Sequence, residues 1–399
     1  GSEMCIRDRV ATGANAKSAT DSATIAKNKP VFTVVKQNPI TSIKDQNRSG
    51  TCWAYSTLSY FESEILKHTG KTYDLSEMFV ANKTYMDRAT MAVRMHGDVS
   101  FSQGGSAYDV LYALQHYGIV PEGAMPAPGT LTGDSLANFG EFFDVMTPYV
   151  EAVAKSNAKK ISSAWKSGLQ GIIDSYIGKT PEKFTYQGKQ YTPQSFCQSL
   201  GLNLDDYVTI TSYTHHPMWS KFAVEVQDNW RWPLSYNVPM DDLCKIIDNA
   251  INNGYTVAWG GDVTEDGFTR KGLGIAYDVK KVRSMAGTDA DHWFKLSKDE
   301  KKEKFDSLGV NAPEVVPTQA MRQEAFDNWE TTDDHGMHIY GIAKDQNGKE
   351  YYMVKNSWGE YGDYKGTWYM TKAFVAYKTM DFMVNKNALP KDIRKKLGI

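Results

Sequence analysis

The sequence predicts an α+β fold in two lobes, a helical lobe first and a β-rich lobe last, with a large, mainly helical insertion. Two observations lead to this fold class. Apolar residues recur at helical spacing in the early part of the chain, and strand-like runs flank a hairpin turn near its end. Helices and strands that are segregated along a chain are typical of α+β packing. The length of 399 residues allows two or three packed units.

The composition excludes several classes of function. The chain is 41% hydrophobic and 23% charged, and its net charge of -2 predicts no general attraction to nucleic acid or to an anionic membrane. No apolar run approaches the roughly 18 residues that a membrane span needs. Four cysteines, none in a C-x-x-C pair, are too few for a disulfide framework and argue against structural zinc. We therefore expect a globular protein without a metal or a cofactor.

The chain divides into four expected regions. Residues 1–29 form a tag remnant and a disordered lead-in, because they are rich in small and polar residues without an apolar period. Residues 30–130 form the helical lobe, and 131–206 form a helical insertion. Residues 207–399 form the β-rich lobe, which contains a charged helical insertion over 280–330.

Two helices define the first lobe. After a strand-like run at 31–35, a helix begins at Cys52 and ends at Gly70, since apolar residues between them keep a helical period. The next helix begins at Ser106, whose spacing from Asp109 is that of a capping box.

The second lobe begins with a helix and turns to strands. Apolar residues over 243–251 have helical spacing, and 255–259 has the character of a buried strand. Two further runs, 337–343 and 351–355, flank the turn sequence DQNG at 345–348. We expect these runs to pair as a hairpin.

Cys52 is the candidate nucleophile. A helix N-terminus carries partial positive charge and unpaired N–H groups, which favour the reactive thiolate. Position alone also fits a small buried cysteine without a chemical role. Gln46, six residues upstream, would supply an oxyanion donor together with the Cys52 backbone N–H. Taken alone, Gln46 is equally an exposed residue of a polar turn.

His335 is the candidate general base, and Asn356 is its orienting partner. His335 enters one strand of the hairpin and Asn356 ends the other, so the amide would hold the imidazole while the second ring nitrogen reaches Cys52. His338 is the rival base. Three residues on in a strand, it points to the opposite face, and we expect a surface or interface residue there. A metal pair of the two histidines is disfavoured because their spacing suits a helix and no third ligand is evident.

Gly104 and Gly105 are candidates for substrate binding. Two glycines before a helix let another backbone approach closely, as a bound peptide would, although a plain turn explains them equally well. Trp358 would shield the histidine–asparagine hydrogen bond or simply belong to the core. His215 and His216 fit a structural role better than a metal-binding one.

Together these residues resemble the papain family of cysteine peptidases. Residues 46–56 (QNRSGTCWAYS) resemble the family's oxyanion glutamine and nucleophile motif. Residues 334–337 (DHGM) are similar to its histidine motif, 356–359 (NSWG) to its asparagine motif, and 103–105 (QGG) to its substrate-binding glycine pair. The resemblance implies a two-lobed papain-like fold and the hydrolysis of peptide bonds through a thioester acyl-enzyme.

Departures from the usual pattern indicate one branch of the family. Cys52 and His335 lie 283 residues apart, against roughly 130–150 in papain-like enzymes, so the chain is extended mostly within 131–330. This long form, with residues 254–263 and 384–390, resembles the bleomycin hydrolases and bacterial aminopeptidase C. That branch implies an enzyme that trims amino acids from peptide N-termini, usually as a hexamer.

The branch resemblance also implies a C-terminal arm in the substrate site, whose terminal carboxylate meets the α-ammonium group of the substrate. Only residues 391–399 follow Pro390, so this arm looks short. An open site would instead favour an endopeptidase or another Cys-His acyl-transfer enzyme. A non-catalytic peptide-binding module is disfavoured, because all four candidate catalytic residues are present. The expected partners are peptide substrates and further copies of the chain in a homo-oligomer, with no nucleic acid and no membrane.

The expected location depends on two features that point in different directions. Ser49 replaces the family's usual local cysteine, so the disulfide there is absent, and free cysteines suit the cytoplasm. The start of the chain, rich in Ala, Ser, Thr and Lys, suits a mature exported protein. We expect a bacterial periplasmic or secreted protein, with the cytoplasm as the alternative.

Overall fold

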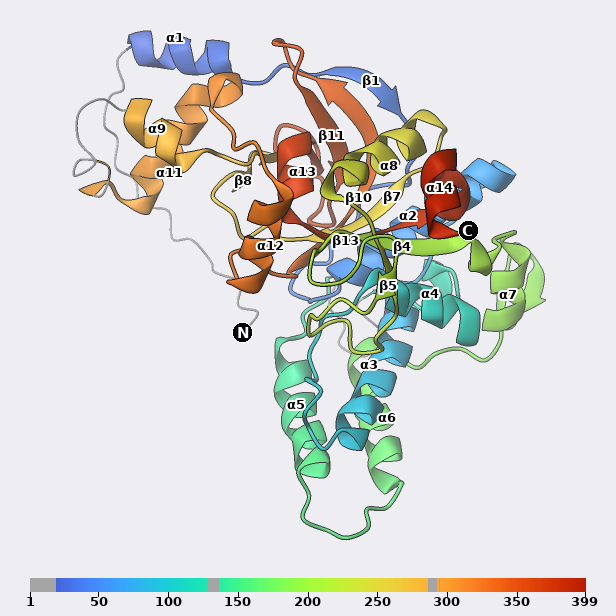
Figure 1. Cartoon of the computed structure of the whole chain (residues 1–399). Coiled ribbons are helices and arrows are strands. Elements are labelled where there is room, and N and C mark those ends of the chain that lie inside the picture. Colours follow the sequence, from blue (N-terminus) through green and yellow to red (C-terminus); the bar gives the residue numbers. More distant parts are fainter. Residues whose placement is uncertain (1–18, 128–135, 286–292, 294) are drawn as a thin grey trace.

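A computed structural model of the chain describes residues 19–127, 136–285, 293 and 295–399. It has a helical lobe and a lobe built on a large mixed sheet, which confirms the predicted α+β class (Figure 1). The described helices are α1 (Ala19–Asn28), α2 (Cys52–Thr69), α3 (Glu77–Arg94), α4 (Ala107–His116), α5 (Gly140–Ala154), α6 (Ala164–Ile177), α7 (Pro193–Ser199), α8 (Met240–Asn252), α9 (Val279–Met285), α11 (Lys298–Leu308), α12 (Gln319–Asp327), α13 (Lys372–Lys378) and α14 (Lys391–Leu397). Short 3-10 helices are η1 (Glu122–Ala124), η2 (Leu204–Asp206), η3 (Gly309–Asn311) and η4 (Lys386–Ala388).

The strands belong to two sheets. A two-stranded sheet pairs β2 (Phe184–Tyr186) with β3 (Lys189–Tyr191). The large sheet runs in the order β5-β6-β4-β13-β7-β10-β11-β12-β9-β8, and β1 pairs with β10 beside this path. Its strands are β1 (Thr33–Gln37), β4 (Tyr207–Thr211), β5 (Lys221–Phe222), β6 (Ser235–Asn237), β7 (Val257–Gly261), β8 (Phe268–Thr269), β9 (Leu273–Gly274), β10 (His335–Lys344), β11 (Glu350–Lys355), β12 (Thr367–Thr371) and β13 (Thr379–Asn385).

The helical lobe is built around α2. Its side chains from Trp53 to Ile65 are buried, and it ends where Gly70 adopts a left-handed conformation with φ 70°, as the sequence predicts. The predicted capping box is also present, since Asp109 and Ser106 bond reciprocally at the start of α4. These caps fix where the two helices that flank the site begin and end.

The β-rich lobe is built around the predicted hairpin of β10 and β11, whose turn includes Gly348 at φ 82°. Helices α8, α13 and α14 contribute to the apolar core that packs against this sheet. Strand β7 spans Val257–Gly261, two residues later than the predicted run, and pairs with β10 through His335 and Gly261. The N-terminal end of β10, where the candidate base lies, is therefore held in the interior of the sheet.

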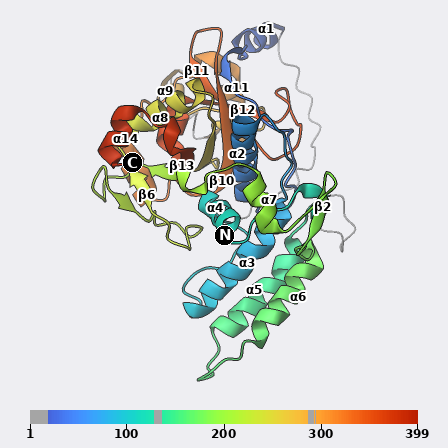
Figure 2. The same cartoon turned by 90° about the vertical axis from the view of Figure 1, so that its right-hand side faces the viewer.

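The region 131–206 is mainly helical but also contains the β2–β3 hairpin, which the sequence did not predict. Within it, α5 and α6 pack on each other and on α3, and both views show this group extending away from the sheet (Figures 1 and 2). Residues 131–135 lie outside the described ranges.

Two expectations about the start of the chain are wrong. Residues 19–28 form helix α1 instead of a disordered lead-in, because Asn28 hydrogen bonds with the carbonyl of Ser307 (3.0 Å) and with Asn311 (3.0 Å), which docks the helix on the α11–η3 segment. Residues 1–18 lie outside the described part of the chain. Strand β1 also differs from expectation, since it belongs to the sheet and not to the helical lobe.

Residues 391–399 do not form the C-terminal arm in the substrate site that the branch resemblance implied. Helix α14 buries Ile393 and Leu397 in the core of the β-rich lobe, and Ile399 packs against the same core. The side chain of Arg394 donates to the carbonyl of Ile399 (3.3 Å). Apolar spacing on α14 thus holds this segment on the sheet lobe. Among the described helices, none combines the length and the apolar character that a membrane crossing requires.

Candidate active site

Cys52 is the first residue of α2, directly after a tight turn. Within this turn, Ser49 Oγ donates to the carbonyl of Gln46 (2.6 Å), and Gln46 Nε2 donates to the carbonyl of Ser49 (2.8 Å). The Gly50 N–H is bound by the side chain of Gln103 (2.7 Å), so the turn is fixed against the loop that precedes α4. The thiol therefore lies at a helix N-terminus, where the dipole favours negative charge.

His335 and Asn356 meet as the sequence predicts. His335 Nε2 is 2.8 Å from Asn356 Oδ1, and the same oxygen accepts from the backbone N–H of Ser357 (2.8 Å). An atom that already accepts from a backbone N–H must be the amide oxygen, so His335 Nε2 is the donor. The proton on Nε2 leaves Nδ1 as the basic nitrogen of the neutral ring.

Gly336 brings this base to the nucleophile. Its backbone amide favours the thiolate form of Cys52, and a Cβ at this position would lie 2.8 Å from Ser56 Oγ and 3.5 Å from Trp53 Cα. The absence of a side chain at Gly336 leaves room for the Ser56 hydroxyl where β10 approaches the first turn of α2. The residue before Gly336 is His335, so the close contact puts the base beside Cys52.

Burial controls the charges of both groups. It raises the pKa of the Cys52 thiol to about 12, against the opposing effect of the Gly336 hydrogen bond, and it lowers the pKa of His335 to about 4, against that of Asn356. Each group therefore resists charging while the other is neutral. Proton transfer from thiol to imidazole creates both charges at once, and their attraction offsets part of the desolvation.

Gln46 is oriented from both lobes. Ser357 Oγ donates to Gln46 Oε1 (2.6 Å), and the Gln46 backbone N–H donates to the carbonyl of Ser357 (2.8 Å). One N–H of the side-chain amide is used by Ser49, and the other has no partner among the described residues. That N–H and the unpaired backbone N–H of Cys52, at the start of α2, are the two donors that an oxyanion needs. Sequence reasoning did not single out Ser357; its position next to Asn356 was the available signal.

Trp358 covers the histidine–asparagine pair. Its ring centroid lies 4.9 Å from that of His335, and Asn356 is only 1% exposed. Water is therefore excluded from the hydrogen bond that holds the imidazole, which strengthens it.

The two glycines differ in their surroundings. Arg88 Nη1 donates to the Gly104 carbonyl (2.7 Å), and a Cβ on Gly104 would lie 2.3 Å from a carboxylate oxygen of Asp228. Gly105 faces the ring of Trp53, and among the described residues none hydrogen bonds with its N–H or C=O. Gly105 thus remains open to a peptide backbone, whereas Asp228 covers Gly104. Sequence reasoning missed both Arg88 and Asp228, which lie 140 residues apart.

Of the two places that we expected for His338, a surface or an interface, the structure shows the interface between α2 and β10. His338 is fully buried, and its Nδ1 lies 2.8 Å from Ser59 Oγ on α2. Burial, followed by the charge of Lys355, holds its pKa well below the usual range. It points away from the nucleophile, as the strand alternation predicts, and joins α2 to β10.

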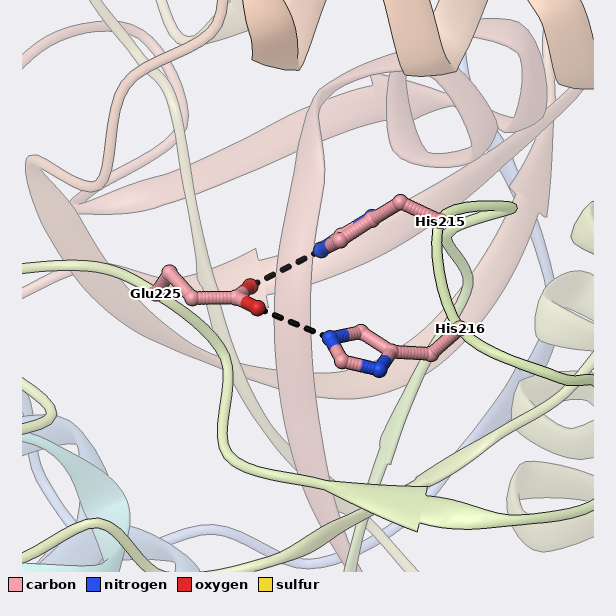
Figure 3. Close-up of side chains that lie close together, drawn as sticks. All are labelled: His215, His216 and Glu225. Atoms are coloured by element: carbon pink, nitrogen blue, oxygen red, sulfur yellow. Dashed lines mark hydrogen bonds and ion pairs between the residues drawn. The ribbon is translucent and has the colours of Figure 1, made fainter.

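A second cluster of histidines lies on the β-rich lobe. His215 and His216 point their Nε2 atoms at the two carboxylate oxygens of Glu225, at 2.9 and 2.8 Å (Figure 3). Gln323 Oε1 accepts from the Thr214 N–H (2.6 Å), so Gln323 Nε2 donates to His215 Nδ1 (3.1 Å). The ring proton of His215 must then be on Nε2, where it donates to Glu225. This arrangement fits a hydrogen-bonded anchor better than a metal site.

Comparisons with known proteins agree with this geometry. Residues 31–216 match the family described as papain family cysteine protease, and residues 306–398 match the peptidase C1-like family. The chain is 24% identical to aminopeptidase G of Lactobacillus delbrueckii subsp. lactis, over 89% of this chain and 83% of the relative. It is also 24% identical to aminopeptidase C of Lactobacillus helveticus, over 91% and 85%. The solved structure of PepW from Lactobacillus rhamnosis superposes with a TM-score of 0.68 at 20% identity, over 96% of this chain and 87% of that one.

Substitutions of the two histidines should have different effects, one on catalysis and the other on stability. We expect Cys52→Ala to abolish turnover of a peptide substrate and His335→Ala to reduce it almost as far. His338→Ala should keep kcat per folded molecule but lower the free energy of unfolding by about 1–3 kcal/mol, because Ser59 loses a buried partner. Steady-state kinetics and thermal melts measure the two effects. A folded, inactive His338→Ala beside an active His335→Ala would reverse the assignment.

The oxyanion site should act mainly on kcat. Gln46→Ala should lower kcat by about 10²–10³ with little change in KM, since an oxyanion donor acts mainly in the transition state. Ser357→Ala, which only loosens Gln46, should lower kcat by about tenfold or less. A Gln46→Ala enzyme in which only KM rises would mean that Gln46 binds substrate and does not stabilise the oxyanion.

Proposed function

This chain belongs to the papain family of cysteine peptidases, and we propose that it is an aminopeptidase in which Cys52 attacks the bond after the first residue of a peptide. The observation that carries the chemistry is the contact of Gly336 with Cys52, which brings the His335–Asn356 pair to the thiol at the start of α2. The hydrogen bonds of Gln46 with Ser357 and of His335 with Asn356 support a single site for all four residues of the sequence motifs.

The reaction follows from these positions. His335 Nδ1 takes the proton of the Cys52 thiol, and the sulfur attacks the scissile carbonyl carbon while Gln46 Nε2 and the Cys52 N–H stabilise the oxyanion. The imidazolium then gives its proton to the leaving amine, and the C–N bond breaks to leave a thioester. Water, deprotonated by His335, attacks the thioester and releases the acid and the thiol. Asn356 holds the ring in the required tautomer throughout.

Removal of single N-terminal residues is favoured over the alternatives by the relatives, which carry the name aminopeptidase. An endopeptidase, or an enzyme that transfers acyl groups by the same Cys-His chemistry, remains the second candidate, because residues 391–399 lie on the sheet lobe and do not close the site. The complete Cys-His-Asn-Gln set gives no support to a binding module without catalysis.

We also propose that the protein assembles as a closed homo-oligomer, with a hexamer as the form implied by the branch it resembles. The support is the projecting group of α5, α6 and the loop between them, which packs on α3 and exposes apolar side chains such as Val145 on α5 (41%) and Ile161 in the loop (42%).

N-terminal selectivity should be visible with matched substrates. We expect the enzyme to cleave a free aminoacyl fluorogenic amide at least about tenfold better in kcat/KM than its N-acetylated form, because acetylation removes a charge-assisted hydrogen bond. The Cys52→Ala variant serves as the blank. Equal cleavage of the two amides would contradict the aminopeptidase activity and leave the endopeptidase.

The assembly should be measurable apart from catalysis. Light scattering at micromolar concentration should give a mass several times that of the 44.7 kDa chain. A double change of Val145 and Ile161 to Asp should reduce that mass, while a matched pair of changes at the exposed Val34 and Val35 of β1 should not. A monomer in the unaltered protein would rule out the assembly and leave the catalytic proposal intact.

A further inference from the structure

Residues 224–232, here called the strap, belong to the β-rich lobe but lie against the helical lobe beside the nucleophile. Ion pairs hold the strap at Asp228 and Arg231, and hydrogen bonds with two histidines hold it at Glu225. Arg231 Nε, for example, donates to the buried carboxylate of Asp109 at 2.7 Å. The strap is therefore anchored at its beginning, middle and end, and the middle anchor lies at the substrate site.

The middle anchor is the ion pair of Asp228 with Arg88. Arg88 is fully buried and uses all five of its N–H donors. Its Nη1 donates to the Gly104 carbonyl (2.7 Å) and to Asp228 Oδ1 (2.9 Å), while the remaining donors bind Ser100 and the carbonyl of Gln227. Because no donor is spare, Arg88 fixes Asp228 by one oxygen and leaves the other unbound.

That second oxygen is available to a ligand. Asp228 Oδ2 hydrogen bonds with none of the described residues, and the side chain is 25% exposed. It lies where a Cβ on Gly104 would be, at 2.3 Å from that position, so glycine is what makes room for it. A partly buried carboxylate oxygen without a hydrogen-bond donor is unfavourable, so a ligand that supplies a donor would be stabilised there.

A second carboxyl group acts on the same site from the other lobe. Asp333 lies two residues before His335, is partly buried, and hydrogen bonds with no residue that the structure describes. Burial and the charge of Asp228 hold its pKa well above the usual range. The charges of both aspartates also raise the pKa of the Cys52 thiol, in addition to burial. Asp333 therefore favours its neutral form, which leaves Asp228 as the carboxylate that offers negative charge to a substrate cation.

We propose that Asp228 Oδ2 binds the α-ammonium group of the substrate and so sets the scissile bond one residue from the N-terminus. This assignment rests on the proposed aminopeptidase activity. An ammonium group supplies the missing donors and charge, and a charge-assisted hydrogen bond in a partly buried position is strong. An acylated N-terminus would lack the positive charge and keep only one of the three N–H donors, and its acyl group would have to fit beside the carboxylate. An internal aspartate thus does what the branch resemblance assigned to a C-terminal carboxylate.

The substrate also tunes the nucleophile in this arrangement. The negative charge of Asp228 opposes the Cys52 thiolate until a cation lies beside it. A bound ammonium offsets that charge, so a free N-terminus favours the thiolate–imidazolium pair and should raise kcat as well as lower KM. If Asp228 only filled the space beside Gly104 and its charge had no role, it would affect KM and leave kcat unchanged.

The test is the ratio of kcat/KM for a free aminoacyl amide to that for its N-acetylated form. Asp228→Asn keeps the acceptor for Arg88 but removes the charge, and it should lower this ratio by about ten- to hundredfold. Asp87→Asn is the matched control. Asp87 pairs with Arg231 at 2.8 Å and is 23% exposed, so it has nearly the same environment away from the nucleophile, and its ratio should not change.

Gly104→Ala tests the role of Asp228 in a second way, since the new Cβ must push the carboxylate away without changing its charge. This variant should also lose the preference for the free amine, and it replaces Asp228→Asn as the test if Asp228→Asn does not fold. An unaltered enzyme that cleaves both substrates equally would refute the aminopeptidase activity itself. An enzyme that prefers the free amine, and keeps that preference in a folded Asp228→Asn or Gly104→Ala variant, would overturn only the role of Asp228.

Discussion

The close contact between strand β10 and the first turn of helix α2 is the constraint on which the rest of the site depends. A thiol at a helix N-terminus is only a potential nucleophile, and a histidine on a strand is only a potential base. Gly336 lets the two backbones meet, with its amide at the Cys52 sulfur. A methyl group there would lie 2.8 Å from Ser56 Oγ, so either that hydroxyl or the strand would have to shift. His338, buried on the opposite face of the same strand, ties β10 to Ser59 one turn further along α2.

The segment before α2 joins the lobes a second time. Asp45 forms a bridge with Trp358, and the backbones of Lys44 and Gln46 hydrogen bond with Gly359 and Ser357. Burial lowers the pKa of Lys44, but the surrounding carboxylates raise it by more, and Glu77 has the largest effect among them. The oxyanion donor Gln46 is therefore held by residues of both lobes, and any relative movement of the lobes would alter the catalytic geometry.

The electrostatics of the site bear on two functions, the activation of the thiol and the recognition of the substrate N-terminus. Burial disfavours the charged form of both the nucleophile and the base, so the thiolate and the imidazolium stabilise each other when they form together. Beside them, the strap brings Asp228 from the β-rich lobe to the helical lobe, where Arg88 binds only one of its two carboxylate oxygens. Selectivity for a cationic N-terminus and activation of the thiol can then depend on the same carboxylate, since a bound ammonium group offsets the negative charge that opposes the thiolate.

The sequence by itself determined much of this protein, because the relevant signals are local. The helical period and Gly70 defined α2, the spacing of Ser106 and Asp109 defined the cap of α4, and the DQNG turn defined the β10–β11 hairpin that pairs His335 with Asn356.

The remaining features depended on contacts between residues far apart in the chain. Arg88 and Asp228 have no joint signature, since their pairing exists only where the strap crosses to the helical lobe. Helix α1 formed in a polar segment because Asn28 docks near residue 307, and α14 lies on the sheet because its two apolar residues find a core there. Local spacing thus predicted the nucleophile and its base, whereas tertiary packing decided which charge faces the substrate, because long-range ion pairs leave no period in a sequence.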